Sequence, residues 1–347
     1  MRKNRFRRHD VTVRPMHIDE ILDRSHVVAL PMAVRFRGVD TREALLIDGP
    51  AGWGEFAPFL EYDARESAAW LRAGLEAAFE GFPAYRRSVV EVNATVPAVI
   101  PGEVESVLAR YPGCRVVKVK VAEKGQTLAD DVARVQAVRA VLPQAVVRVD
   151  ANRGWTVPEA LEAARVLGPL DYMEQPCHSV EELAQLRGEL MRAGLFVRVA
   201  ADESIRREED PYRVAELRAA DVAVVKVAPL GGVRPVLALT EHLRARHMDV
   251  TVASALDTAV GMNAGLAAVA ALPVLEDDDG LDVPPAAAGL ATGSLFVEDV
   301  AAPREIVDGH MSVEPVVPDP ARLAALEAPA DRRDWWFARV REALQYV

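Results

Sequence analysis

The sequence of 347 residues predicts an α/β protein in which a (β/α)8-type barrel follows a small α+β unit. The barrel is indicated by eight short apolar segments that alternate with helical patterns at spacings of roughly 25 to 30 residues. The α+β unit is indicated by two strand patterns and a helix pattern near the start, and a proline-rich stretch with a closing helix follows the barrel. A doubly wound sheet is the alternative fold, but it would rarely need this many regular units.

We expect three parts along the chain. Residues 1–88 are predicted to form the α+β unit, with a disordered basic tail at 1–10. Residues 89–299 are predicted to form the catalytic barrel, and residues 300–347 form a proline-rich closing segment. The helix expected at 332–344 closes this last part.

The α+β unit is predicted to contain two strands and a helix. Val27–Phe36 and Ala44–Ile47 have strand patterns. Asp63–Glu66 is a capping box that opens an apolar helix ending near Phe79. Gly52–Ala57 matches the dinucleotide-binding pattern only loosely, because Pro58 follows where a helix would have to begin. We interpret this segment as an aromatic-rich loop that covers a cavity.

The barrel strands are expected where apolar runs lie between turn residues. They are Val89–Val96, Val116–Ala122, Val146–Asp150, Asp171–Glu174, Val197–Asp202, Val222–Val227, Val250–Ser254 and a last one near Leu281–Val283. The helices between them are expected around Glu103–Arg110, Leu128–Leu142, Pro158–Leu167, Val180–Ala193, Tyr212–Ala219, Val233–Arg246 and Met262–Leu272.

The charge and hydropathy of the chain exclude several classes of function. A net charge of −11 and a pI near 5.3 give no electrostatic footprint for nucleic acid or for a membrane surface. No apolar run approaches a membrane span, and the two cysteines form no disulfide framework. We therefore expect a soluble cytoplasmic protein, with its oligomeric state left open.

Lysine is scarce, and its placement suggests chemistry. Only five of the 41 basic residues are lysine. Lys118 and Lys120 share one face of a valine-rich strand, and Lys226 lies in another such strand. Unlike arginine, a lysine in an apolar site can give up its proton and act as a base. A lysine that takes a proton near neutral pH needs a pKa depressed by burial and nearby cations, from about 10.4 to roughly 7–8.

Three consecutive strands end in a carboxylate. These residues are Asp150, Glu174 and Asp202, separated by 24 and 28 residues. The carboxyl ends of barrel strands meet at one face, where the three charges would repel each other unless a cation joined them. Hard oxygen ligands favour Mg²⁺, with Mn²⁺ as a substitute. Asn152 and Glu203 are expected around this metal, Glu203 pointing away from Asp202 if the strand continues.

The lysines and acids together indicate proton removal next to a carboxylate. Strands two and six lie on opposite sides of a barrel, so Lys120 and Lys226 are expected to face each other across the metal. A lysine base and a divalent cation suit this reaction. A lysine Schiff base is a further possibility, but it would leave the three acids unexplained. The sequence has no H-E-x-x-H, P-loop or G-x-S-x-G motif.

This ordered set of motifs resembles the muconate-lactonizing branch of the enolase superfamily. The match covers nearly the whole chain, and it implies that residues 1–88 form an α+β capping domain, which the C-terminal segment of residues 300–347 completes. The motifs are Lys118-Val119-Lys120, Asp150-Ala151-Asn152, Glu174-Gln175-Pro176, Asp202-Glu203-Ser204 and Lys226. Within the branch, the cover segment from Gly52 to Phe59, Tyr62 and the stretch Gly280-Leu281-Asp282 are most similar to the o-succinylbenzoate synthase family, whose members act in menaquinone biosynthesis.

The resemblance implies a dehydration and a role for each residue. Lys120 takes the α-proton of 2-succinyl-6-hydroxy-2,4-cyclohexadiene-1-carboxylate and returns it to the departing hydroxyl in a syn elimination. Lys226 contacts the opposite face of the ring, and Lys118 assists the substrate carboxylate and lowers the pKa of Lys120. Ser254 binds the succinyl carboxylate, in a Ser254–Thr258 segment where relatives more often have two serines and a glutamate.

Two other functions are compatible with the sequence. An N-succinylamino acid racemase or dipeptide epimerase would use the same metal and lysines, with Lys120 and Lys226 exchanging the roles of base and acid. A non-catalytic barrel that serves as a scaffold is the alternative from a different class. Its sequence would have lost a metal ligand or a lysine, and none is missing here.

Overall fold

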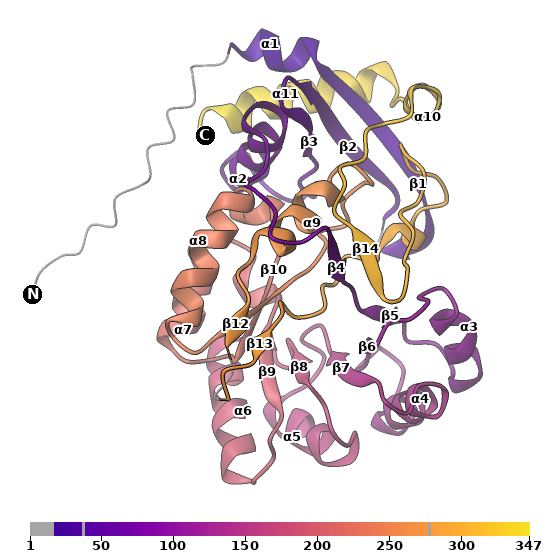
Figure 1. Ribbon diagram of the computed structural model, residues 1–347, viewed down its shortest axis with the longest axis vertical. Coiled ribbons are helices and arrows are strands. Elements are labelled where there is room, and N and C mark those ends of the chain that lie inside the picture. Colours follow the sequence, from indigo (N-terminus) through magenta and orange to yellow (C-terminus); the bar gives the residue numbers. More distant parts are fainter. Residues whose placement is uncertain (1–16, 37–38, 277–278) are drawn as a thin grey trace, which may run out of the picture.

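The computed structural model describes residues 17–36, 39–276 and 279–347. The basic tail expected at 1–10 lies outside these residues. Over the described ranges, the helices are all too short or too polar to span a bilayer. Figure 1 shows an antiparallel sheet with its helices in the upper part of the view, above a barrel of parallel strands.

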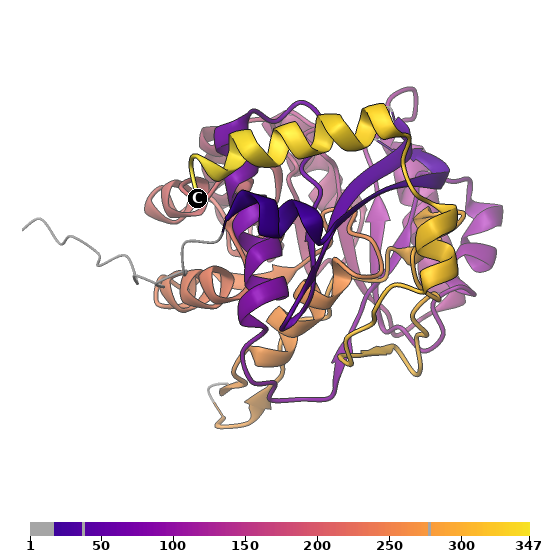
Figure 2. The ribbon, with the colours of Figure 1, turned by 90° about the horizontal axis from the view of Figure 1, so that it is seen from above.

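The upper part is built on three antiparallel strands and the helices that cover them. The strands are β1 (Ser25–Phe36), β2 (Val39–Gly49) and β3 (Gly52–Phe56), in that order. The helices are α1 (Ile18–Asp23), α2 (Ala64–Leu75, continued by a π-helical turn at Glu76–Glu80) and α11 (Ala330–Leu344). The expected capping box opens α2, where Asp63 and Glu66 bond each other's backbone. The closing helix α11 contacts α2 and β1, as Figure 2 shows from above.

Strand β3 corrects one expectation, since Gly52–Phe56 was predicted to be a loop. Its residues Gly52 to Phe56 pair with Gly49 to Leu45 of β2. Two glycines allow β3 to lie directly on α2, because a Cβ atom on Gly54 would overlap the carbonyl oxygen of Gly74. The aromatic residues that follow β3, rather than the strand itself, reach the cavity described below.

Seven parallel strands form the barrel wall, which confirms the predicted (β/α)8-type architecture with a capping domain. Their order in the sheet follows their order along the chain, from β11 back to β5. They are β5 (Ala94–Val96), β6 (Val116–Lys120), β7 (Val146–Asp150), β8 (Tyr172–Glu174), β9 (Arg198–Ala201), β10 (Val222–Val225) and β11 (Asp249–Val252). Residues 89–96, expected to be one strand, divide between β5 and β4 (Val89–Glu91), which pairs with β14 (His310–Ser312).

The eighth strand was predicted at the wrong place. Asp282–Val283 (β13) pairs antiparallel with Leu275–Glu276 (β12), away from the barrel sheet. The ring is closed instead by the alanine-rich segment that follows. Ala288 bridges to Val92 and Gly289 bridges to Ala253, both in parallel fashion. Alanine and glycine have little strand propensity, so this closing segment gave no strand pattern in the sequence.

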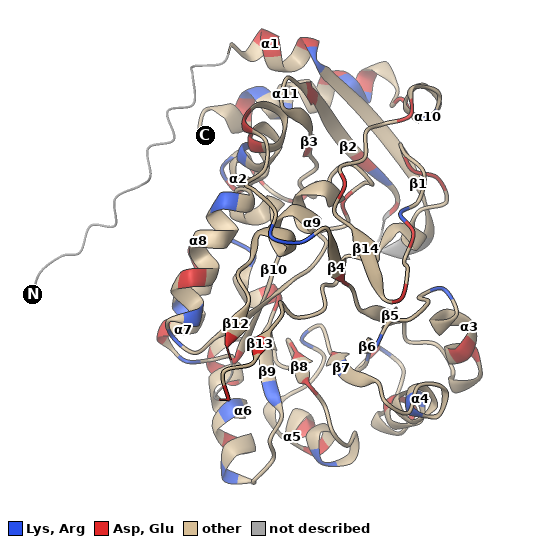
Figure 3. Cartoon of the chain, in the orientation of Figure 1, with Lys and Arg blue, Asp and Glu red and all other residues tan. Residues whose placement is uncertain are grey.

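Helices surround the barrel. They are α3 (Val104–Leu108), α4 (Leu128–Val141), α5 (Val157–Val166), α6 (Val180–Arg192), α7 (Asp210–Glu216), α8 (Val233–Arg244) and α9 (Met262–Ala271), with α10 (Pro320–Ala325) before α11. Acidic and basic residues mark α6, α7 and α8 in Figure 3, whereas α9 has none and is buried along most of its length. The valines of the strands pack against the inner faces of these helices.

Candidate active site

A cavity of about 620 Å³ lies at the carboxyl ends of the barrel strands. Three aromatic residues form part of the cavity wall. Phe59 and Tyr62 lie in the segment between β3 and α2, and Trp70 lies on α2. Their rings pack on one another, with centroids 5.8–6.2 Å apart. All nine residues that the sequence predicted for the site line this one cavity: Lys118, Lys120, Asp150, Asn152, Glu174, Asp202, Glu203, Lys226 and Ser254.

Strand register explains why lysines and acids meet. Lys120 pairs with Asp150 across β6 and β7, and Asp150 pairs with Glu174 across β7 and β8. Side chains at matched positions of parallel strands point to the same side of the sheet. The Lys120 Nζ atom lies 2.5 Å from Asp150 Oδ2, and Lys118 Nζ lies 3.0 Å from Glu174 Oε1 and 3.4 Å from Asp150 Oδ2. Across the cavity wall, Lys226 donates to Asp202.

Burial and mutual repulsion perturb these groups. Glu174 is buried, and its burial together with the neighbouring charge of Asp150 raises the pKa of Glu174 to about 7. Burial also acts on Asp150, but the ammonium groups of Lys120 and Lys118 outweigh it and hold the pKa of Asp150 below its ordinary value. In the same way, Glu174 and Asp150 outweigh the burial of Lys118 and raise the pKa of that lysine.

The three carboxylates are the donor type for a hard divalent cation. In this conformation, no three His, Cys, Asp or Glu side chains of the described residues stand close enough together to hold a metal ion. Instead, each of the three acids has a lysine beside it. Asp150, Glu174 and Asp202 are nevertheless buried at adjacent strand ends, and the charges of Asp150 and Asp202 both raise the pKa of Glu174. A cation bound here would relieve that repulsion, so the residues fit a magnesium-type site.

Asn152 and Glu203 lie side by side at the cavity. The Asn152 side chain accepts from Lys120 at 2.7 Å and donates to Glu203 Oε1 at 3.1 Å. Glu203 does not point away from the cavity, because β9 ends at Ala201 and a 3₁₀ turn over Glu203–Ile205 redirects the chain. Arg206, which the sequence reasoning missed, also lines the cavity and donates to Glu203 Oε1 at 2.9 Å.

Gln175 is a second residue whose role was missed. Its buried amide joins the ends of β8 and β9 with four hydrogen bonds. The Oε1 atom accepts from the backbone N–H groups of Asp202 and Ser204, each at 3.1 Å. The Nε2 atom donates to Ser204 Oγ at 2.8 Å and to the Cys177 carbonyl at 3.0 Å. The sequence offered only its place in Glu174-Gln175-Pro176 as a signal, whereas the structure shows that it orients Asp202.

Ser254 lies on a loop that follows β11. Its hydroxyl donates to Asp257 Oδ2 at 2.9 Å and accepts from the backbone N–H groups of Leu256 and Asp257. Arg110 and Tyr111, after α3, line the cavity as well. No pattern pointed to these two residues, since arginine is common in this chain and a single tyrosine has no spacing to interpret.

Comparisons with known proteins agree with this architecture. The Enolase C-terminal domain-like family model matches residues 103–319, and the Enolase N-terminal domain-like model matches residues 27–78. The o-succinylbenzoate synthase of Mycolicibacterium smegmatis is 58% identical over 93% of this chain and 96% of its own. That of Mycobacterium marinum is 54% identical over 94% of this chain and 95% of its own.

Solved structures share the fold. The muconate lactonizing enzyme from Pseudomonas putida superposes with a TM-score of 0.69 at 21% identity, over 88% of this chain and 98% of its own. The muconate lactonizing enzyme from Pseudomonas fluorescens, complexed with muconolactone, gives the same TM-score at 23% identity.

Proposed function

We propose, because this chain belongs to the o-succinylbenzoate synthase family of the enolase superfamily, that it dehydrates 2-succinyl-6-hydroxy-2,4-cyclohexadiene-1-carboxylate to 2-succinylbenzoate in menaquinone biosynthesis. The reaction makes the chain a metal-dependent hydro-lyase. The observation that carries the proposal is the set of three lysine–carboxylate pairs inside one capped cavity. We place the protein in the cytoplasm, where its small-molecule substrate would be found.

Lys120 is the proposed base. As the neutral amine, it removes the proton from the ring carbon that bears the carboxylate. The electron pair of that C–H bond becomes a ring double bond as the C–O bond of the hydroxyl breaks, and the ring becomes aromatic. The ammonium of Lys120 then returns the proton to the departing oxygen, so that water leaves from the same face. The position of Lys120 at the end of β6, at the cavity and only partly exposed, supports this role.

Asp150, Glu174 and Asp202 would hold Mg²⁺, with Mn²⁺ as a substitute. When bound, the cation supplies positive charge opposite the substrate carboxylate as the adjacent carbon loses its proton. Asn152 and Glu203 keep Lys120 and Arg206 in place beside these ligands through the hydrogen bonds described above. Gln175 fixes the backbone of Asp202.

Lys226, Lys118 and Ser254 are the proposed substrate contacts. Lys226 lies on β10's end, separated from β6 by three strands of the sheet, which suits contact with the opposite face of the ring. Lys118 lies one layer deeper than Lys120 and assists the substrate carboxylate. The hydroxyl of Ser254 binds the succinyl carboxylate. The cap encloses the substrate, and we propose that the cap consists of residues 1–88 and 300–347 around a barrel of residues 89–299.

The nearest alternative is racemization of N-succinylamino acids or epimerization of dipeptides. Both reactions need a proton transfer on each face of the substrate, whereas the dehydration needs only one face. The test is to measure 2-succinylbenzoate formation and, in D₂O, exchange of the α-hydrogen of several N-succinylamino acids. We expect rapid dehydration of the cyclohexadiene. Rapid exchange without any dehydration would overturn the proposed function in favour of the racemase.

A further inference from the structure

The loop that carries Ser254 has a strained backbone. Ser254, Ala255 and Leu256 line the cavity. Leu256 has φ of 66°, in the left-handed region that a residue other than glycine adopts only at an energetic cost. A conformation of this kind persists only where surrounding contacts impose it. The residues that hold the loop therefore determine where Ser254 points.

Contacts from outside the loop supply this restraint. From β2, the Arg42 Nε group donates to the carbonyl oxygen of Leu256 at 3.2 Å. From β3, Glu55 Oε2 accepts from the Thr258 backbone N–H at 3.1 Å and from the Thr258 hydroxyl at 2.6 Å. Asp299 accepts from the Ala259 backbone N–H at 2.9 Å. The capping sheet thus bonds to both sides of Asp257.

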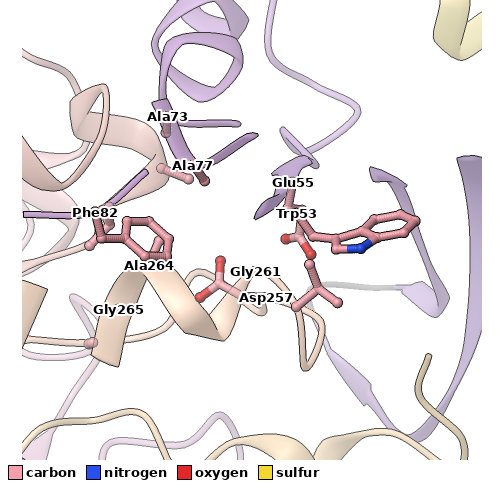
Figure 4. Close-up of a pocket in the computed structure, with 13 residues that line it drawn as sticks. Trp53, Glu55, Ala73, Ala77, Phe82, Asp257, Gly261, Ala264 and Gly265 are labelled. Atoms are coloured by element: carbon pink, nitrogen blue, oxygen red, sulfur yellow. The ribbon is translucent and has the colours of Figure 1, made fainter. Parts of the chain in front are cut away.

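The carboxyl group of Glu55 is closely packed as well as hydrogen-bonded. Figure 4 shows Glu55 and Asp257 together at a small cavity of about 20 Å³ between the capping sheet and the barrel. A Cβ atom on Gly261 would lie 2.5 Å from Glu55 Cδ, so the glycine leaves just enough room for the carboxyl group. The Thr258 hydroxyl that bonds Glu55 also accepts from the Gly261 backbone N–H, at the start of α9.

A carboxylate at this position lowers the stability of the folded state when it is charged. Burial and the nearby charge of Asp257 raise the pKa of Glu55 to about 7. A neutral residue would avoid this penalty, yet only a side chain with an acceptor oxygen can receive both bonds from Thr258. Glu55 does not line the 620 Å³ cavity, so it does not contact a substrate there directly, whereas its hydrogen bonds reach the loop that does line the cavity.

We propose that Glu55 is a positioning residue for substrate binding: from the capping sheet, it holds the loop from Ser254 to Thr258 in the conformation that presents Ser254 to the substrate. This inference rests on the proposed function, because it assigns the loop to the succinyl carboxylate. It also accounts for the hydrogen bonds between this barrel loop and the capping sheet, which join the cap to the wall of the substrate cavity.

Two substitutions of Glu55 separate its acceptor from its charge. Glu55→Gln keeps an amide oxygen that accepts both bonds, and we expect its KM and kcat to stay near the wild-type values. Glu55→Ala removes the acceptor and frees the loop. We expect KM for the cyclohexadiene carboxylate to rise at least about tenfold, with kcat within roughly threefold, because the base and the metal ligands are untouched.

Glu43→Ala is the matched control for a purely structural effect. Glu43 also lies on the capping sheet, where it accepts from Arg332 at 2.8 Å and from the Trp336 indole at 2.9 Å. We expect this variant to lower Tm while KM stays unchanged. If Glu55→Ala behaves in the same way, with a lower Tm and the wild-type KM, the positioning role is wrong. If Glu55→Ala does not fold, Thr258→Val should raise KM and Thr258→Ser should not, and equal KM values for the two would overturn the proposal.

Hydrogen exchange separates failure of this inference from failure of the proposed function. In Glu55→Ala, we expect faster amide exchange across residues 254–260 than in the wild type or in Glu55→Gln. Unchanged exchange there would overturn the positioning role whatever the substrate. Absence of dehydration by the wild-type protein would instead overturn the proposed function and, with it, the assignment of the loop to the succinyl carboxylate.

Discussion

Lys120 Nζ lies 2.5 Å from Asp150 Oδ2, so the proposed base and a proposed metal ligand are direct hydrogen-bond partners on adjacent strands. Lys118 likewise bonds Glu174, which lies two strands away on β8, and Lys226 bonds Asp202. In this conformation, the lysines neutralise the carboxylates that a divalent cation would bind. Binding of the cation and the arrangement of the lysines are therefore coupled.

Mg²⁺ is expected to stabilise the fold. A ligand at 100 times its Kd adds about 2.7 kcal/mol to the free energy of unfolding, which corresponds to a rise in Tm of a few degrees. EDTA should reverse the shift, and Asp202→Asn should abolish it. Glu123→Gln, which changes an exposed acid of the same cavity, should retain it. Equal Tm values of the wild type with Mg²⁺ and with EDTA would argue against the metal site.

The free energy of unfolding should depend on the protonation of Glu55. Its pKa is about 7 in the folded chain against an ordinary value of 4.5, so the folded state binds more protons between these values. The stability from this group is complete below about pH 4.5 and is lost as the pH rises through about 7, a difference on the order of 3 kcal/mol. This pH-dependent loss is measured by comparing the free energies of urea unfolding of the wild type and of Glu55→Gln at pH 5 and at pH 8. The wild type should lose more stability than the variant, and parallel pH profiles would contradict the shift.

Gln175→Glu should destabilise the barrel although the two side chains have the same shape. The change removes the Nε2 donor and sets a carboxylate oxygen against the Cys177 carbonyl in a fully buried place. We expect a loss of about 3 kcal/mol in the free energy of unfolding by urea. The control is Gln185→Glu on the exposed face of α6, with a change within about 0.5 kcal/mol. A loss as small as that of the control would contradict the role of Gln175.

Gly54→Ala should weaken the attachment of β3 to α2. The added methyl group would overlap the Gly74 carbonyl oxygen, and we expect a loss of about 1–3 kcal/mol in stability. Gly102 provides a control, since a Cβ atom there meets nothing within 4 Å. Thermal unfolding of Gly54→Ala and Gly102→Ala should therefore differ, and equal Tm values would show that β3 can move away at little cost.

Local patterns predicted which residues gather at the cavity better than they predicted the contacts that hold those residues in place. The strand periodicity around Lys120 and the acids at consecutive strand ends depend on residues close together in sequence, and all nine predicted residues reach one cavity. The capping box at Asp63 was likewise readable because both partners lie within one turn. The contacts of Glu55 with Thr258 join residues about 200 positions apart, and no local pattern encodes them.

The errors have the same origin. The closing segment at Ala288 and Gly289 is extended only because Val92 and Ala253 pair with it from both sides. Its sequence carries no strand signal of its own, whereas Leu281–Val283 has one but pairs elsewhere. Glu203 points toward the cavity because β9 ends at Ala201, one residue before the expected end at Asp202, and a 3₁₀ turn follows. Where a strand ends and which strand it pairs with depend on tertiary contacts, and the alternation of apolar and polar side chains in the sequence does not reveal these contacts.

The central claim is that Lys120 removes the proton in the dehydration, and Lys120→Arg tests it most directly. Arginine keeps the positive charge beside Asp150 but cannot give up a proton near neutral pH. With Mg²⁺ present, the measurement is kcat for conversion of the cyclohexadiene carboxylate to 2-succinylbenzoate, with the exposed Lys124→Arg as the control. We predict a fall of roughly 10³-fold or more for Lys120→Arg and wild-type turnover for the control. Turnover by Lys120→Arg within about tenfold of the wild type would contradict the account.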